Sequence, residues 1–134
     1  MTRHALLMIA FSFALAATGC ATIEADANRA EASDVEASLR SAGFVLIPSD
    51  TPQRIESMRT LPPLVFSQVE RERGSYFVYA DPSSCMCIWV GTIEEMQRFS
   101  ELVSEEALGR FQGEVGIVEM QADLWDPDWA GIDD

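Results

Sequence analysis

The sequence Cys85-Met86-Cys87 carries more potential chemistry than any other stretch of the chain. On a β-strand, residues i and i+2 lie about 6.6 Å apart at Cα, and disulfides usually join Cα atoms about 4.4 to 6.8 Å apart. A bridge is therefore feasible with distortion, which a turn over residues 81–84 can supply, and such a bridge would be easily reduced. Three interpretations stay open: buried structural cysteines, a labile disulfide, or a Cu(I) site assisted by Met86 or Met96.

The third cysteine, Cys20, follows a segment with the layout of a secretory signal. Arg3 precedes an uncharged apolar run over residues 5–17. As a helix this run is about 20 Å long, too short for a hydrocarbon core of about 30 Å. Three small residues, 17–19, then precede Cys20. This pattern resembles the lipobox of bacterial lipoproteins, in which the cysteine thiol is acylated, although Ala17 stands where leucine is usual.

The lipobox resemblance implies that residues 1–19 are a signal peptide and that Cys20 carries the lipid anchor. Acyl chains such as palmitate anchor a protein because each buried CH₂ contributes about 0.8 kcal/mol. Ala21 follows where an aspartate would imply inner-membrane retention, so the resemblance implies the periplasmic face of the outer membrane. The alternative is an ordinary signal peptide cut after Ala16, which would give a soluble periplasmic protein.

The charge of the chain excludes several functions. It has 9 basic and 22 acidic residues among 134, a formal net charge of −13, and every strong base is arginine. Nucleic-acid binding is excluded, because phosphate contacts need clustered Lys or Arg. Removal of residues 1–19 takes away Arg3 and His4, which leaves 8 basic against 22 acidic residues, net −14, with no His or Lys.

Catalysis is disfavoured by that composition, and no cofactor is predicted. A serine or cysteine nucleophile would lack its usual base, and the histidine spacing of zinc hydrolases is absent. Paired carboxylates remain, since glycoside hydrolysis needs only two. Glu94/Glu95 and Glu105/Glu106 are the candidate pairs, but their place on predicted helices favours a solvated face.

Residues 111–134 show no hydrophobic periodicity, and Trp125 and Trp129 occur there among several aspartates. Such a segment buries too little apolar surface to offset its ordering entropy. We therefore expect an acidic, flexible tail. A second interpretation makes the two tryptophans a short linear motif that docks on a partner.

The elements that must position these residues follow from caps and periodicity. Residues 20–33 are expected to form a tether. The predicted elements are a helix over 34–42, a short strand over 44–47, a helix over 52–60, strands over 64–71, 76–79 and 85–90, and a helix from 93 that Gly109 can end. Short turns make the last three strands antiparallel neighbours.

The predicted fold class is α+β. One small domain, residues 34–110, is expected to hold a three- to four-stranded antiparallel sheet packed against two to three helices. Cys85 and Cys87 share one face of the last strand. A core this small is marginal alone, which favours a partner.

Four short motifs occur in a characteristic order along the chain: Ala42-Gly43-Phe44, Leu61-Pro62-Pro63, residues 76–82 and residues 85–91. This series resembles a group of small, uncharacterised bacterial exported proteins and lipoproteins over roughly residues 40–105. Trp89 and Phe99 stand where that group has tyrosines. The resemblance implies an architecture and an exported address, and no activity.

The sequence thus predicts an envelope lipoprotein, held in a membrane by lipid at Cys20, that acts as a non-enzymatic interaction or structural module with an envelope protein as partner. The alternative is a thiol redox or copper-handling protein that uses Cys85 and Cys87.

Overall fold

The structure, a computed structural model, describes residues 34–112, 116–126, 128–129 and 132. The predicted signal peptide 1–19, Cys20 and the predicted tether to residue 33 lie outside the described residues. Asp34–Asp134 forms one compact unit. None of its described helices combines the length and the apolar character needed to cross a bilayer.

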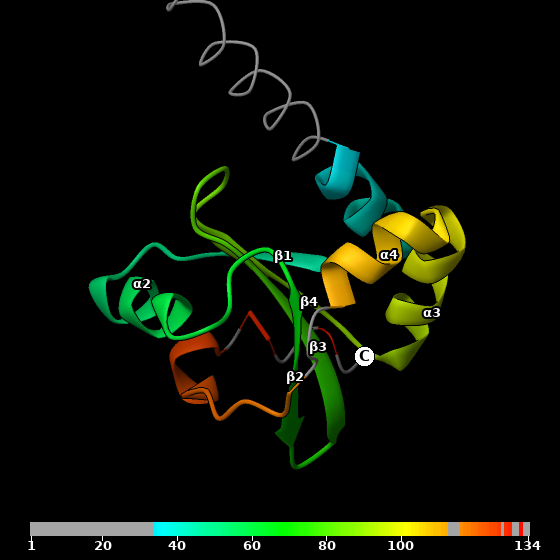
Figure 1. The fold of residues 1–134 in the computed structure, drawn as a ribbon. Coiled ribbons are helices and arrows are strands. Elements are labelled where there is room, and N and C mark those ends of the chain that lie inside the picture. The colour runs from blue at the N-terminus through cyan, green and yellow to red at the C-terminus, as the bar shows by residue number, and fades with distance from the viewer. Residues whose placement is uncertain (1–33, 113–115, 127, 130–131, 133–134) are drawn as a thin grey trace, which may run out of the picture. The chain divides into compact units, whose positions relative to one another are not determined.

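Four antiparallel strands form one sheet in the order β1-β4-β3-β2 (Figure 1). The strands are β1 (Val45–Pro48), β2 (Phe66–Arg71), β3 (Gly74–Asp81) and β4 (Cys87–Gly91). Short turns join β2, β3 and β4 into the predicted meander, and β1 pairs with β4 as the fourth strand.

Helices cover both faces of this sheet (Figure 1). The helix over residues 34–42, α3 (Ile93–Leu102) and α4 (Glu105–Gln112) lie on one face. The other face carries α2 (Pro52–Arg59) and a 3₁₀ helix, Ala122–Trp125. The predicted α+β arrangement, with helices packed on an antiparallel sheet, is confirmed.

Because successive side chains of a strand point to opposite faces of the sheet, each face has its own hydrophobic core. The α3-side core contains Val35, Leu39, Ala42, Phe44, Phe66, Tyr79, Cys87, Trp89, Met96, Phe99 and Phe111. The α2-side core contains Ile47, Met58, Leu61, Val69, Tyr76, Val78, Ala80, Ile88, Val90, Trp125 and Trp129.

Each edge of the sheet is blocked at one position. On the β2 edge, the Gln68 N–H donates to the Gly116 carbonyl at 3.2 Å, and the Val118 N–H donates to the Gln68 carbonyl at 2.9 Å. On the β1 edge, Pro48 has no N–H to donate, and its carbonyl accepts from Arg54 Nη1 at 3.2 Å.

The prediction of a single helix from residue 93 to 108 is wrong. α3 ends at Leu102 because Val103 is extended, with φ −109° and ψ 156°. Ser104 then begins α4, and its Oγ accepts from the Ala107 N–H at 3.2 Å, as an N-cap does. The change of direction places the Phe111 ring 5.9 Å from that of Phe99.

The prediction of a flexible tail over residues 111–134 is wrong for the described part of that segment. Trp125 and Trp129 are both 0 % exposed. They lie in the α2-side core, and without them this face of the sheet would be more exposed to water. The composition of the tail by itself carries no information about what covers that second face.

Candidate functional site

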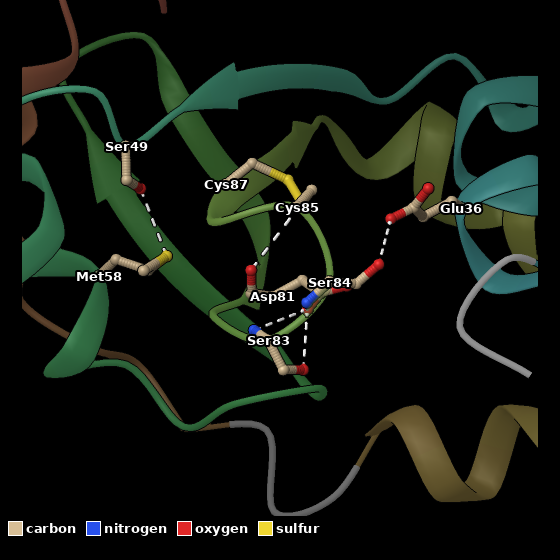
Figure 2. Close-up of a disulfide and its surroundings, with 8 residues drawn as sticks. All are labelled: Glu36, Ser49, Met58, Asp81, Ser83, Ser84, Cys85 and Cys87. Carbon is tan, nitrogen blue, oxygen red and sulfur yellow. Dashed lines mark hydrogen bonds between the residues drawn. A yellow bond between two sulfur atoms is a disulfide. The ribbon is translucent and has the colours of Figure 1, made fainter. Parts of the chain in front are cut away.

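Cys85 and Cys87 are joined by a disulfide, with their Cα atoms 5.1 Å apart (Figure 2). The spacing left three interpretations open, and the structure agrees with the one that joins the two cysteines in a disulfide. The strand predicted from residue 85 begins only at Cys87, because Cys85 and Met86 belong to the turn that precedes β4. The distortion needed for a bridge between residues i and i+2 is supplied there.

The backbone around the disulfide is strained. Met86, between the two cysteines, has φ 50°, and Leu64 has φ 60°. They are the only non-glycine residues with positive φ in the described part of the chain. A non-glycine residue in this region costs roughly 1 to 3 kcal/mol, and such residues concentrate at functional sites.

Both strained residues lie at the same end of the sheet, where β3 turns into β4. The Leu64 N–H donates to the carbonyl of Ala80 near the end of β3, at 2.9 Å. Met86 directly precedes β4, and its carbonyl accepts from the Ser49 N–H at 3.0 Å. Leu64 and Met86 are 43 % and 39 % exposed as whole residues, so this end of the sheet presents apolar residues to solvent.

Asp81 organises the turn that carries Cys85. Its Oδ1 accepts hydrogen bonds from the Ser83 N–H at 3.1 Å, the Ser83 hydroxyl at 3.2 Å and the Ser84 N–H at 2.8 Å (Figure 2). An aspartate that bonds the backbone two and three residues ahead fixes a turn. Asp81 is also the cross-strand partner of Cys87, and it is only 2 % exposed.

A second carboxylate reaches the disulfide from the helix over residues 34–42. Glu36 Oε1 accepts from the Ser84 hydroxyl at 3.0 Å (Figure 2). Oxygen atoms of Glu36 and Asp81 and the Sγ of Cys85 all lie within 4.8 Å of one another. The disulfide is thus set in a locally negative environment.

The two sulfur-bearing residues differ in access. Cys85 is partly buried and packs against the rim of the α3-side core, whereas Cys87 has 0 % exposure and lies inside that core. Sγ of Cys85 lies 3.8 Å from the Asp81 carbonyl oxygen. In the disulfide this is a contact without a proton, while a reduced Cys85 thiol could donate to that oxygen.

The copper interpretation depends on the oxidation state of this pair. Cu(I) is bound by thiolate and thioether sulfur, and the bridged sulfurs carry no thiolate. Met86 is partly exposed beside the bridge, while Met96 is buried in the α3-side core. Only the reduced protein could hold the metal with both cysteines.

The two tryptophans considered for docking are buried instead. Arg54 lies over Trp125, with its guanidinium carbon 5.3 Å from the ring centroid, and Arg71 lies over Trp129 at 4.9 Å. Arg54 Nε also donates to the Leu124 carbonyl at 2.6 Å. These contacts give the aromatic side chains a structural role and leave no aromatic surface for a partner.

The carboxylate pairs proposed from sequence do not form a site. Glu95 accepts from the Thr92 N–H at 2.7 Å and from the Thr92 hydroxyl, which closes the capping box of α3. Glu94, Glu105 and Glu106 are exposed on helix first turns.

A groove between α2 and residues 119–121 has a volume of about 470 Å³. It is lined by Gln53, Glu56, Ser57, Thr60, Glu119, Met120 and Gln121. Sequence reasoning did not indicate this groove, because its walls come from segments with no shared motif. Glu56 and Glu119 are both exposed, so neither carboxylate is held in a site that excludes water.

Comparison of the chain with protein-family models, with curated proteins and with solved structures gave no match. The resemblance to small exported proteins therefore stays a prediction, and inference about function starts from the residues themselves.

Proposed function

We propose that this chain is an envelope lipoprotein, held at the periplasmic face of the outer membrane through acylated Cys20, whose domain is a non-enzymatic interaction module. The observation that carries the proposal is the Cys85–Cys87 disulfide. Disulfides persist in oxidising compartments such as the periplasm and are rare in the cytosol. The bridge is therefore what an exported domain would contain.

The same bridge bears on Cys20. The chain has three cysteines, and two of them are joined to each other. Cys20 is the remaining one, and it stands at the end of the lipobox-like pattern. Acylation gives this thiol a function that requires no cysteine partner.

The interaction role is supported by the disulfide end of the sheet. Leu64 and Met86 are exposed there, and Glu36 and Asp81 supply negative charge. An envelope protein with a positively charged, partly apolar surface would complement it.

The anchor is tested with labelled palmitate in cells that express the full chain. Wild-type protein is expected to incorporate label and to fractionate with membranes, and Cys20→Ala is expected to lose both properties. The matched control is the double variant Cys85→Ser/Cys87→Ser, which keeps Cys20 and should still be labelled. Unlabelled wild-type protein would contradict the anchor.

The partner is tested by crosslinking in intact cells with the anchored full chain. Leu64→Glu combined with Met86→Glu is expected to abolish a specific crosslinked protein, because two added charges oppose an apolar contact. Ile93→Glu, a 53 % exposed residue at the start of α3, is the control and should leave the crosslink in place. Loss of the crosslink in the control alone would place the interaction elsewhere.

A second candidate function, thiol redox or copper handling, is favoured by the partial exposure of Cys85 within a disulfide. Intact mass of periplasmic protein with and without reductant, together with metal analysis, tests it. Fully reduced and metal-free cysteines would contradict it.

A further inference from the structure

We propose that the Cys85–Cys87 disulfide is an exchange site that oxidises a pair of thiols on a positively charged surface of another exported protein. The inference rests on the thiol redox candidate and names its direction, its reactive atom and the chemistry of its partner. Four observations carry it: the unequal burial of the two cysteines, the strained residue between them, the two adjacent carboxylates and the exposure of Met86.

The unequal burial selects the sulfur that is attacked. Cys87 has no exposed surface and sits in the α3-side core, whereas Cys85 is partly exposed at the edge of that core. A partner thiolate can therefore approach only the Cys85 sulfur. Cys87 is then the leaving group, and the core holds it next to Cys85.

The reaction balances in two steps. A partner thiolate attacks Cys85 Sγ, the bond between Cys85 and Cys87 breaks, and Cys87 leaves with the electron pair and takes up a proton. The second partner thiol loses its proton and attacks the partner sulfur of the mixed disulfide, which releases Cys85 as a thiol. Two electrons and two protons pass from the partner dithiol to this protein, and the partner gains one disulfide.

The backbone at Met86 favours this direction. The bridge holds Met86 at φ 50°, and reduction frees the turn to adopt a negative φ. Relief of that strain favours the reduced form, which makes the disulfide a better oxidant. Met86→Gly, which removes the penalty for positive φ, should shift the glutathione equilibrium toward the disulfide by about fivefold or more.

The charges specify the partner. Glu36 and Asp81 repel an approaching thiolate unless it is accompanied by Lys or Arg. The same cations lower the pKa of the partner thiol and so supply the reactive thiolate. Exposed Met86, between the two cysteines, adds apolar contact beside the reacting sulfur.

The test uses detergent-solubilised full-length protein and a reduced synthetic peptide with two cysteines flanked by arginines. An otherwise identical peptide carries glutamates in place of the arginines. Mass spectrometry is expected to show one peptide disulfide formed for each protein disulfide lost. The arginine peptide should react about tenfold faster at low salt, and the difference should shrink at high salt.

Two variants that each keep one cysteine of the pair identify the attacked sulfur through reaction with Ellman's reagent. Cys87→Ala, which retains Cys85, should react at least tenfold faster than Cys85→Ala, which retains the buried Cys87. Cys20 is unchanged in both, so it contributes equally. If either variant fails to fold by circular dichroism, mass spectrometry of the mixed disulfide between the arginine peptide and wild-type protein decides, and attachment to Cys87 contradicts attack at Cys85.

The outcomes separate this inference from the functions proposed above. Wild-type protein that keeps its disulfide with both peptides contradicts the exchange site but leaves the anchor and a structural disulfide in place. Purified protein without the disulfide contradicts the thiol redox function itself. Equal oxidation of the two peptides at low salt contradicts the positively charged partner.

Discussion

Gly91, at the end of β4, sits where no side chain fits. A Cβ at this position would lie 2.8 Å from Cδ1 and Cε1 of Phe44 and 2.9 Å from Cβ of Glu95. Phe44 is 4 % exposed and contacts other rings in the α3-side core, so it cannot move away freely. Phe44 and Glu95 of α3 therefore pack directly against the backbone of a residue that lacks a side chain.

Gly91→Ala is expected to lower the free energy of unfolding by about 1 to 3 kcal/mol, the usual cost of overpacking. Urea denaturation followed by circular dichroism measures it. Gly109→Ala is the matched control, because a Cβ there meets nothing within 4 Å and the residue lies inside α4. The control should be stabilised by about 0.5 to 1 kcal/mol. Equal effects of the two substitutions would contradict the packing argument.

At the scale of single residues, the sequence predicted the cysteine pair but not its surroundings. The spacing of Cys85 and Cys87 made a distorted bridge feasible, and the structure contains one. Glu36 lies 49 positions before Cys85 in the chain, and only the packing of its helix beside the turn brings the two together. No local pattern could have indicated that pairing.

At the scale of elements, α3 begins with the capping box that its sequence predicted. Burial would raise the pKa of Glu95, but hydrogen bonds from Thr92 and the nearby charge of Arg98 outweigh it and hold the pKa below its ordinary value of 4.5. A carboxylate whose pKa is lowered by folding stabilises the folded state above its unfolded pKa. That contribution disappears as the pH falls through the lowered value.

Glu95→Gln should therefore cost about 0.3 to 1 kcal/mol at neutral pH, because the amide still accepts the Thr92 hydrogen bonds but the negative charge at the N-terminus of α3 is lost. The difference from wild type should shrink as the pH falls below 4.5. Urea denaturation across that range measures it. Glu101→Gln, on the exposed surface of the same helix, should change stability by less than about 0.5 kcal/mol throughout. A pH-independent difference at Glu95 would rule out the charge as its cause.

The 3₁₀ helix near the C-terminus is held mainly by Arg54 of α2. Besides the Leu124 and Pro48 carbonyls, its guanidinium contacts Asp50 at 3.3 Å and Asp128 at 3.0 Å. Arg71 is more exposed and pairs with Asp126 at 3.3 Å. A buried arginine with several acceptors contributes more than an exposed ion pair.

Arg54→Met is expected to destabilise the domain by about 2 to 3 kcal/mol, because the carbonyls and carboxylates lose their donors. Arg71→Met, the control, should cost about 1 kcal/mol or less. Tryptophan fluorescence during urea unfolding reports both. Equal losses would mean that the stacking of each arginine on its tryptophan outweighs the hydrogen bonds.

Element positions were largely predictable because their caps are local. Thr51 and Thr92 are the N-caps of α2 and α3, as their sequences predicted. Ser33, the predicted cap of the helix over 34–42, lies outside the described residues. The break at Ser104 and the docking of the 3₁₀ helix were not predictable, because both depend on what the rest of the fold requires. Phe111 must reach the α3-side core, and the α2-side core must be covered.

At the scale of the whole molecule, one sheet is shared by two cores. β3 supplies Tyr79 to one core and Val78 to the other, and β4 divides Trp89 and Val90 in the same way. Neither core can therefore lose its packing without disturbing strands that the other needs. The domain should unfold as one cooperative unit.

The tryptophans provide a probe for each core. Trp125→Phe/Trp129→Phe leaves only Trp89 in the α3-side core, and Trp89→Phe leaves only the two tryptophans in the α2-side core. Within each variant, the urea midpoint from fluorescence should coincide with the midpoint from circular dichroism. Separate midpoints would show that the α2-side layer unfolds on its own.

The blocked positions at the edges of the sheet have a consequence for crowding. Exposed strand edges let neighbouring molecules join into continuous sheets, and the risk grows when many copies share a small area. Here Pro48 interrupts the β1 edge, and the segment around Ile117 covers the middle of the β2 edge. Each interruption shortens the stretch of strand to which a neighbouring copy could pair.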